Sequence, residues 1–477
     1  MSGPLWAWQE LVAAAGGVDD GAAPSGIGGF SIDTRTIQPG EMFVALKDQR
    51  DGHDFVTAAF KAGAAAAIVA RGYQRRDGDG ALLRVEDPLR ALERIGIAAR
   101  ARLAPGARVV AVTGSAGKTG TKEMLRAALA TAGKVHAAVK SFNNHWGVPL
   151  TLAGMPADTR FGVFEIGMNH AGEITPLARM VRPHVAVVTN VLPVHIGNFA
   201  DGEAGVARAK AEIFAGLEPD GVAVIPHDSP HRELLRRSVP AGARIVSFGV
   251  GPGASVAARS IATEEAGSRI EVAIGGRTFR YLCGVPGDHI AINSLAVLAV
   301  LDTLGLAADA ALAPLAALAP PPGRGARSVL AVAGGTALLI DESYNANPAS
   351  MRAALAVLAA AAPEPGGRRI AVLGDMRELG EHGPALHRRL KDAVEQGQAD
   401  KVFACGHLMR NLFEAIPAGR RGAWAELSTG LIVPLLAELK AGDVVMVKGS
   451  LGTNMAPIIA GLKICNTRLA AAAGKTL

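Results

Sequence analysis

Short apolar runs rich in β-branched residues alternate with longer stretches of helical periodicity along most of the chain. These runs lie at residues 42–46, 67–69, 108–112, 161–166, 185–189, 222–225, 337–340, 370–373, 401–404 and 444–447. Stretches such as residues 203–217 lie between them and carry apolar residues at helical spacing. This alternation of strands and helices predicts an α/β protein with parallel sheets.

Two breaks in the pattern divide the chain into three segments. The sequence Leu103-Ala-Pro-Gly106 ends the first segment, and Pro320-Pro-Pro-Gly323 separates the second from the third. A chain of 477 residues has room for about three domains of ordinary size. We therefore expect domains at residues 1–105, 106–318 and 319–477.

The composition is that of a folded protein, with 49% hydrophobic and 19% charged residues. The cysteines Cys283, Cys405 and Cys465 stand far apart, which predicts buried thiols rather than a metal site. The start of the chain has no basic segment followed by an apolar core, and no later apolar run approaches the ~18 residues of a membrane span. We therefore expect a cytoplasmic protein with no membrane insertion.

The net charge of +6 arises from 49 Lys and Arg against 43 Asp and Glu, spread along the chain. Nucleic-acid binding would be better supported by a basic stripe interleaved with aromatic residues, and aromatic residues make up only 4% here. A mildly basic protein suits small anionic substrates. We expect no nucleic-acid partner.

A glycine-rich loop lies between the apolar run at 108–112 and a helical stretch that starts at Lys118. Glycines let main-chain N–H groups approach phosphates, the lysine supplies positive charge, and the threonine hydroxyl suits Mg²⁺. The common phosphate-loop pattern has a further glycine where this chain has Val112, so the loop is a shorter variant, and a plain strand-to-helix turn is the alternative. The loop residues are Gly114, Ser115, Ala116, Gly117, Lys118, Thr119 and Gly120.

Polar residues follow two of the predicted central strands, at the sheet edge where ligands of parallel α/β sheets bind. Glu165 ends the run at 161–166 and offers, with Thr119, the oxygen ligands that Mg²⁺ prefers. His195 follows the run at 185–189, and Lys210 lies on the helical stretch after it. Taken alone, His195 would be a structural histidine and Lys210 a surface lysine.

Together these elements resemble the Mur ligase family, whose central ATPase domain combines such a loop with a strand-end Glu, a His and a carbamylated Lys. The resemblance implies that Lys118, Glu165, His195 and Lys210 are catalytic and that ATP and Mg²⁺ are used. Thr119 and Glu165 would hold one ion, and Glu165, His195 and carbamylated Lys210 a second. It also implies a Rossmann-like C-terminal domain after a P-loop-type central domain.

Four further motifs resemble the branch of this family that adds D-alanyl-D-alanine. They are the segments at 141–152, 165–170, 341–348 and 372–380, accompanied by Gly287-Asp-His-Ile-Ala-Ile-Asn293 where the family contacts the nucleotide. The implied substrate contacts are Asn143, Asn144, Tyr344 and Asn345. The implied nucleotide contacts are His289, Asn293, Arg324 and Asp341, with Arg324 joining the site when the third domain closes.

The first segment resembles the family's domain that docks the UDP-sugar-peptide. The motif Ser31-Ile-Asp-Thr-Arg35 implies uridine-diphosphate contacts from Ser31, Asp33, Thr34 and Arg35, although the same residues are also suited to capping turns. The family often has Lys-Gly-Ser-Arg near its end, whereas this chain has Lys448-Gly-Ser-Leu-Gly-Thr453. An arginine role at position 451 is therefore not carried over.

The resemblance implies an ATP-dependent amide ligase acting on UDP-N-acetylmuramoyl-tripeptide and D-alanyl-D-alanine through an acyl phosphate, and we expect a monomer. The nearest alternative is another ligase of the same fold, such as a diamino-acid-adding Mur ligase or a folylpolyglutamate synthase. A small-molecule kinase or a nucleotide switch that uses the same loop is the alternative from a different class.

Overall fold

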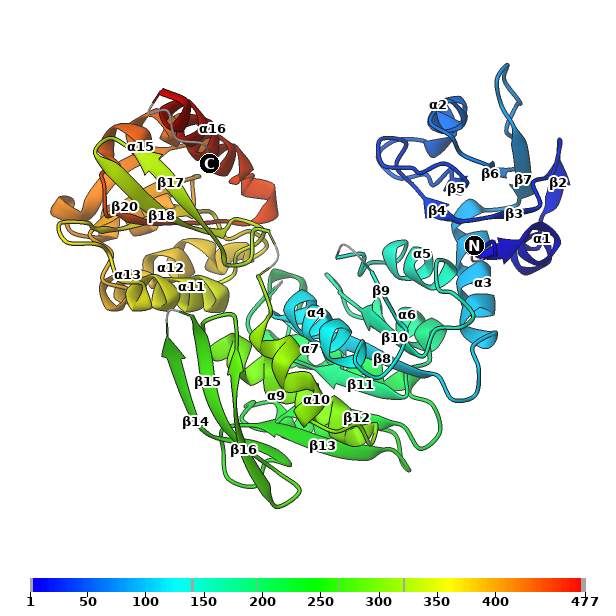
Figure 1. Cartoon of the computed structure of the whole chain (residues 1–477), viewed down its shortest axis with the longest axis horizontal. Coiled ribbons are helices and arrows are strands. Elements are labelled where there is room, and N and C mark those ends of the chain that lie inside the picture. The colour runs from blue at the N-terminus through cyan, green and yellow to red at the C-terminus, as the bar shows by residue number, and fades with distance from the viewer. Residues whose placement is uncertain (1–2, 139–140, 195, 265, 321, 473–477) are drawn as a thin grey trace.

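The computed structural model describes residues 3–138, 141–194, 196–264, 266–320 and 322–472, with side chains to residue 464. It confirms the α/β class. Three sheet-based domains follow one another along the chain, and the central domain lies between the other two (Figure 1). The predicted boundaries fall in connections between elements, the first between α3, which ends at Ala101, and β8, which begins at Arg108.

The N-terminal domain is a five-stranded sheet in the order β2-β7-β6-β5-β4, parallel except for the β2–β7 pair. Its strands are β2 (Val18–Asp20), β4 (Gly29–Ser31), β5 (Glu41–Val44), β6 (Ala66–Ala70) and β7 (Ala81–Val85), beside the small pair β1 (Trp6–Ala7) and β3 (Gly26–Ile27). Its helices are α1 (Trp8–Ala15), α2 (Val56–Lys61) and α3 (Pro88–Ala101).

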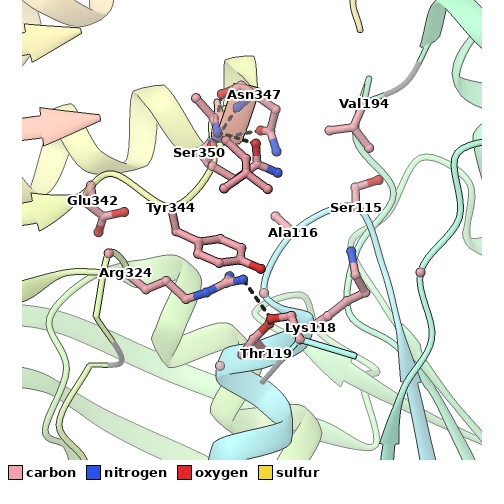
Figure 2. A pocket seen from close by; sticks show the side chains of 18 of the residues that line it. Ser115, Ala116, Lys118, Thr119, Val194, Arg324, Glu342, Tyr344, Asn347 and Ser350 are labelled. Carbon is pink, nitrogen blue, oxygen red and sulfur yellow. Dashed lines mark hydrogen bonds between the residues drawn. The ribbon is translucent and has the colours of Figure 1, made fainter. Parts of the chain in front are cut away.

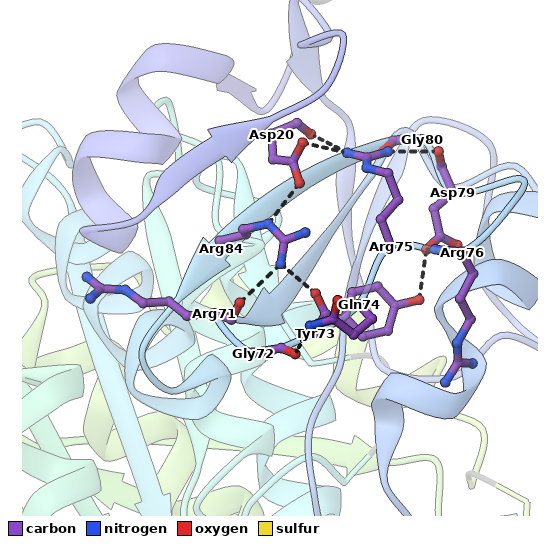
Figure 3. A network of polar contacts seen from close by, with 10 residues as sticks. All are labelled: Asp20, Arg71, Gly72, Tyr73, Gln74, Arg75, Arg76, Asp79, Gly80 and Arg84. Carbon is purple, nitrogen blue, oxygen red and sulfur yellow. Dashed lines mark hydrogen bonds and ion pairs between the residues drawn. The ribbon is translucent and has the colours of Figure 1, made fainter.

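A polar network connects β2, β7 and the loop at 71–80 of this domain (Figure 3). The Asp20 carboxylate on β2 accepts a hydrogen bond from Arg84 on β7 at 2.8 Å and lies 3.0 Å from Arg75. Arg75 also donates to the main-chain oxygen of Gly80, and the Tyr73 hydroxyl donates to Asp79. The hydrogen bond from Arg84 lowers the pKa of Asp20, so this carboxylate stays ionised and holds the loop at 71–80 against β2.

The central domain is a nine-stranded sheet in the order β16-β15-β14-β13-β12-β11-β8-β10-β9, antiparallel only at β14–β15–β16. Its strands are β8 (Arg108–Thr113), β9 (Val135–Ala137), β10 (Phe161–Glu165), β11 (Val185–Val188), β12 (Val222–Pro226), β13 (Arg244–Gly249), β14 (Val256–Glu264), β15 (Gly267–Ile274) and β16 (Arg277–Cys283).

Helices cover both faces of the central sheet. One layer contains α4 (Lys118–Leu129), α9 (Asp288–Thr303) and α10 (Asp309–Ala316), and the other contains α5 (Gly147–Ala153), α6 (Ile174–Val181), α7 (Glu203–Ala211) and α8 (Arg232–Arg237). On β8, Val110 and Val112 pack into the first layer while Val109 and Ala111 pack into the second. Burial on both faces explains why this strand reads as an unbroken apolar run.

The C-terminal domain is a six-stranded sheet in the order β17-β18-β22-β19-β20-β21, parallel except for β17–β18. Its strands are β17 (Ala326–Val332), β18 (Gly335–Glu342), β19 (Arg369–Gly374), β20 (Lys401–Cys405), β21 (Arg421–Ala425) and β22 (Val444–Lys448). One face carries α11 (Pro348–Ala360), α12 (Gly383–Arg388), α13 (Lys391–Gln396) and α14 (Arg410–Ala415), and the other carries α15 (Ile432–Glu438) and α16 (Ala456–Ala472).

The N-terminal and central domains share a hydrophobic core. Leu150 and Ala153 of α5 pack with Trp6 and its neighbours, and the Trp6 indole donates to the main-chain oxygen of Ala153 at 2.9 Å. The Arg102 guanidinium lies 3.6 Å over the Trp6 ring and donates to main-chain oxygens on both sides of the boundary. These two domains therefore form one packed body.

The predicted buried thiols are confirmed for Cys283 and Cys405, whereas the side chain of Cys465 lies outside the described part. Among the helices of the described residues, none combines the length and the apolar character that crossing a membrane requires.

Candidate active site

A cavity of about 840 Å³ lies between the central and C-terminal domains (Figure 2). The phosphate loop, Glu165 and Asn143 line it from the central domain, and the linker residue Arg324 with Tyr344 and Asn345 lines it from the other side. The structure therefore brings together residues that lie far apart in the sequence, at the carboxyl ends of β8 and β10.

Two glycines of the loop have no room for a side chain. Gly117 has a φ of +81°, and a Cβ atom there would lie 2.2 Å from the amide nitrogen of Asn293. A Cβ atom on Gly114 would lie 1.8 Å from the Thr189 hydroxyl. The main chain of the loop can pass this close to its neighbours only because these residues are glycines.

The segment that follows β11 holds the loop in place. The Ala116 N–H donates to the Asn190 side chain at 2.9 Å, and the Ala116 oxygen accepts from the Thr189 hydroxyl at 2.7 Å. The Ser115 hydroxyl donates to the Leu192 oxygen at 3.1 Å and accepts from the Leu192 N–H. These polar contacts order the loop before any phosphate arrives, which reduces the entropy cost of binding.

Lys118 begins α4 and donates to the main-chain oxygen of Gly114 at 2.8 Å. Loss of hydration lowers the pKa of its ammonium group, and Arg324 lowers it further while Glu165 opposes the shift. An anion with several oxygens would remove this penalty, because it would replace the lost water with opposite charge.

Glu165 is 2% exposed and makes its contacts with polar side chains of the site. One carboxylate oxygen accepts from the Thr119 hydroxyl at 2.8 Å, and the other accepts from the Asn143 amide at 2.6 Å. Ser141 lies 2.9 Å from the Thr119 hydroxyl. This group of hydroxyl and carboxylate oxygens fits a hard divalent cation such as Mg²⁺.

Lys210 is 2% exposed, so the interpretation of this residue as a surface lysine is wrong. Burial, and secondarily the charge of Lys118, lowers its pKa well below the usual range. Within the described residues, its amine makes no hydrogen bond or ion pair. His195 lies outside the described residues, and no three His, Cys, Asp or Glu side chains of the described part gather as metal ligands.

Arg324 and Tyr344 form one wall of the cavity (Figure 2). The guanidinium lies 4.1 Å from the centre of the Tyr344 ring and donates to the Ser141 hydroxyl at 3.4 Å. The Tyr344 N–H donates to the main-chain oxygen of Gly323, which has a φ of +73°. Because the Ser141 hydroxyl also lies 2.9 Å from that of Thr119, this pair is connected to the phosphate loop through Ser141.

The other expected nucleotide contacts, His289, Asn293 and Asp341, lie at different positions relative to the cavity. His289 lines the cavity, and burial lowers its pKa, which favours a neutral ring. Asn293 is buried against Gly117. The Asp341 carboxylate accepts from the N–H and hydroxyl of Ser343. Its neighbour Glu342, and not Asp341, lines the cavity.

The expected substrate contacts of the first segment do not reach this cavity. Ser31 hydrogen bonds with the main chain of Asp33, and the exposed Arg35 forms an ion pair with the Asp33 carboxylate at 2.7 Å, within the turn that also contains Thr34. In the central domain, Asn144 accepts from the N–H of Gly147 at the start of α5.

Sequence reasoning missed several residues that build the site. Ser141 and Glu342 lie inside motifs that were recognised but were not selected as contacts. Lys448 is 3% exposed and donates to the Glu342 carboxylate at 3.2 Å and to the Asn345 oxygen. Its position at the end of β22 was the available signal, because parallel strands direct their carboxyl ends to one edge.

Two family models match the chain. The Mur ligase middle domain matches residues 112–301, and the Mur ligase glutamate ligase domain matches residues 326–451.

Relatives match over nearly the whole length. The UDP-N-acetylmuramoyl-tripeptide–D-alanyl-D-alanine ligase of Escherichia coli is 36% identical over 435 residues, which are 91% of this chain and 93% of that protein. The enzyme of the same name from Bacillus subtilis is 33% identical over 441 residues, with the same coverage.

Solved structures of similar proteins also match nearly the whole chain. A crystal structure of MurF from Acinetobacter baumannii has a TM-score of 0.82 and 30% identity, over 96% of this chain and 98% of that one. The Thermotoga maritima MurF ligase in complex with ADP has a TM-score of 0.75 and 26% identity, over 92% of this chain and 98% of that one.

Proposed function

The chain belongs to the Mur ligase family, and we propose that it joins D-alanyl-D-alanine to UDP-N-acetylmuramoyl-tripeptide, consuming ATP, in peptidoglycan precursor synthesis. The observation that carries this function is the match of ligases with this activity over 91% of the chain, at 33% and 36% identity. The phosphate loop and Glu165 line the same cavity, and this supports that cavity as the site of the ATP-dependent reaction.

The reaction divides into two displacements. An oxygen of the tripeptide's terminal carboxylate attacks the γ-phosphorus of ATP, the bond to ADP breaks, and an acyl phosphate forms. The amine of D-alanyl-D-alanine then attacks the acyl carbon, loses a proton and displaces inorganic phosphate. Lys118 and the N–H groups of the loop stabilise charge on the phosphates, since the attacking group and ATP are both anionic.

Mg²⁺ fits the oxygen ligands around Glu165. We assign one ion to Thr119 and Glu165, and a second to Glu165, His195 and a carbamylated Lys210. When bound, these ions would screen the repulsion between the carboxylate and the triphosphate. The buried amine of Lys210 supports the modification, because a neutral amine reacts with CO₂ whereas an ammonium does not.

The remaining site residues are assigned by position. We propose that His289, Asn293, Arg324 and Asp341 bind the nucleotide and that Asn143, Asn144, Tyr344 and Asn345 contact the peptide substrates.

The domain roles follow from the same proposal. We propose that residues 1–105 dock the UDP end of the substrate through Ser31, Asp33, Thr34 and Arg35, that residues 106–318 bind ATP, and that residues 319–477 bind the acceptor. We place the enzyme in the cytoplasm, where ATP and UDP-linked precursors are available, and expect a monomer by light scattering.

The test is a product analysis with ATP, Mg²⁺ and UDP-N-acetylmuramoyl-tripeptide. D-alanyl-D-alanine should give peptide and phosphate in equal amounts, whereas diaminopimelate, lysine and glutamate should give neither. Equal turnover with a single amino acid would indicate a different ligase of this fold. Phosphate transferred to a stable product would indicate a kinase.

A further inference from the structure

Three loops of the C-terminal domain form one wall of the cavity, and Ser450 joins them. Its hydroxyl accepts from the Arg377 N–H at 2.9 Å and donates to the Ala346 oxygen at 3.3 Å, while its N–H donates to the Asp375 oxygen at 3.0 Å. These contacts fix the main chain of Arg377 relative to the segments around 346 and 450.

A buried histidine holds the central loop of this wall from behind. The His387 ring accepts from the Met376 N–H at 2.9 Å, and its other nitrogen donates to the Gly383 oxygen at 2.7 Å. The Asp375 carboxylate accepts from the Met409 N–H at 2.7 Å. The main chain next to Arg377, the residue that follows Met376, is therefore held in place by these hydrogen bonds.

Within the described residues, four lysine and arginine side chains line the cavity: Lys118, Arg324, Arg377 and Lys448. Lys118 belongs to the phosphate loop, and Arg324 stacks on Tyr344 beside it. Lys448 is buried and already paired with Glu342. Within the described part of the chain, the Arg377 guanidinium makes no hydrogen bond or ion pair, so its charge is available to a ligand.

The Arg377 side chain lies across Gly452. A Cβ atom on Gly452 would be 3.0 Å from Cδ of Arg377 and 3.2 Å from its Nε. Leu451, the neighbour of Gly452, also lines the cavity and is 66% exposed. The wall thus offers a guanidinium beside an apolar surface, which is the combination that a small amino-acid side chain next to a carboxylate requires.

We propose that Arg377 binds the carboxylate of the acceptor dipeptide and thereby selects acceptors that end in a free acid. This proposal rests on the ligase function given above. The dipeptide has one amine, which reacts, and one carboxylate, which does not react and would enter the cavity beside two other anionic substrates. A guanidinium pairs with a carboxylate through two parallel hydrogen bonds, so it fixes orientation as well as charge.

The experiment compares D-alanyl-D-alanine with its C-terminal amide as acceptors of the intact enzyme. The wild-type enzyme should prefer the acid by about ten- to a hundredfold in kcat/KM, the range expected for a hydrogen bond to a charged group. In Arg377→Ala the KM for the acid should rise by this factor and the preference should disappear, while the KM for ATP stays unchanged.

Two further variants separate charge from structure. Arg377→Lys should retain part of the preference, because an ammonium supplies charge without the two parallel hydrogen bonds. Arg388→Ala, which removes an exposed arginine of α12 outside the cavity, should behave as wild type.

The outcomes distinguish this proposal from the ligase function. If the wild-type enzyme forms no peptide from either acceptor, the ligase function fails. If it does form peptide but Arg377→Ala keeps the wild-type preference for the acid over the amide, the assignment of Arg377 is overturned.

Discussion

Lys118 and Lys210 are two lysines that lose hydration in the central domain, and the charge of Lys118 further lowers the pKa of Lys210. Lys118 lines the cavity at the start of α4, where its ammonium would meet phosphates, and its hydrogen bond to Gly114 fixes its direction. Lys210 is buried on α7, and the charge of Lys118 adds to the lowering of its pKa. The first is suited to remain a cation, and the second to lose its charge.

Lys118→Ala should reduce kcat on the order of 10²- to 10³-fold, equivalent to ~2.7 to 4 kcal/mol of transition-state stabilisation for one such donor. The fold should survive, because the side chain makes one hydrogen bond to its own loop. Turnover and thermal unfolding are measured together, with Lys134→Ala as the control at an exposed ion pair with Asp158. Near-normal turnover in folded Lys118→Ala would contradict the role of the loop.

Lys210→Ala should be nearly inactive, and acetate should partly restore its activity by placing a carboxylate where the carbamate stood. Lys210→Arg should stay inactive, because a guanidinium has no lone pair for a metal ion. Lys210→Met is the matched control, since it keeps a long unbranched side chain but cannot carry the carbamate oxygens. Ligation rates with and without acetate provide the measurement, and full activity of Lys210→Arg would exclude the carbamate.

At the scale of elements, His184 connects the start of β8 to the turn before β11. The Nδ1 atom of its ring accepts from the Val109 N–H at 2.9 Å, and the main-chain N–H of His184 donates to the Val109 oxygen at 2.8 Å. Burial, followed by the charges of Arg100 and Arg108, lowers its pKa to about 4. The ring must therefore stay unprotonated for this contact to persist.

The low pKa of His184 predicts a loss of stability in mild acid. Between pH 6.5 and about 4 the unfolded chain binds a proton at this histidine and the folded chain does not, so the free energy of unfolding falls as the pH falls. The contribution is roughly 1 to 2 kcal/mol, because solvent screens a partly exposed ring. His184→Asn keeps an acceptor without titrating, so its denaturation curves should depend less on pH. An unchanged pH dependence would contradict the assignment.

Elements buried on both faces could be predicted from the sequence, and half-exposed ones could not. The run at 108–112 became β8 because helices cover it on both sides. The strands β14 to β16 alternate buried and exposed residues in an antiparallel extension, and no continuous apolar run marks them. Side-chain pairs such as Arg324 with Tyr344 depend on how distant segments meet, which periodicity does not encode.

For Lys210, too, the pattern of the sequence did not reveal the surroundings of the side chain. Helical periodicity places it on α7 but does not reveal whether the helix turns that residue to solvent, and composition favoured the surface. Only the resemblance to the Mur ligase family indicated another role for Lys210, that of a carbamylated metal ligand. The phosphate loop was different, because its chemistry is local and Gly117 and Lys118 are consecutive in the sequence.

At the scale of the whole molecule, the active site lies where a packed body of two domains meets a third. The N-terminal and central domains share a core, whereas the cavity between the central and C-terminal domains is lined largely by loops. An acyl phosphate would hydrolyse in water, so the approach of the third domain would protect the proposed intermediate.

Two short 3₁₀ helices, η2 (Ile196–Asn198) of the central domain and η4 (Gly380–His382) of the C-terminal domain, approach each other closely. A Cβ atom on Gly197 would lie 3.2 Å from both Cα and N of Gly380, so any side chain there must move the main chain apart.

Gly197→Val should therefore keep the domains from reaching the arrangement seen here. Nucleotide binding, measured by calorimetry, should persist because the phosphate loop is untouched. Ligation should fall on the order of a hundredfold, the effect of a misplacement of about 1 Å between reacting groups. Phosphate release should exceed peptide formation, since the acyl phosphate would be open to water. Gly72→Val, at an exposed glycine with no atom near its Cβ position, is the control. Equal phosphate and peptide at the wild-type rate in Gly197→Val would show that this contact does not govern closure.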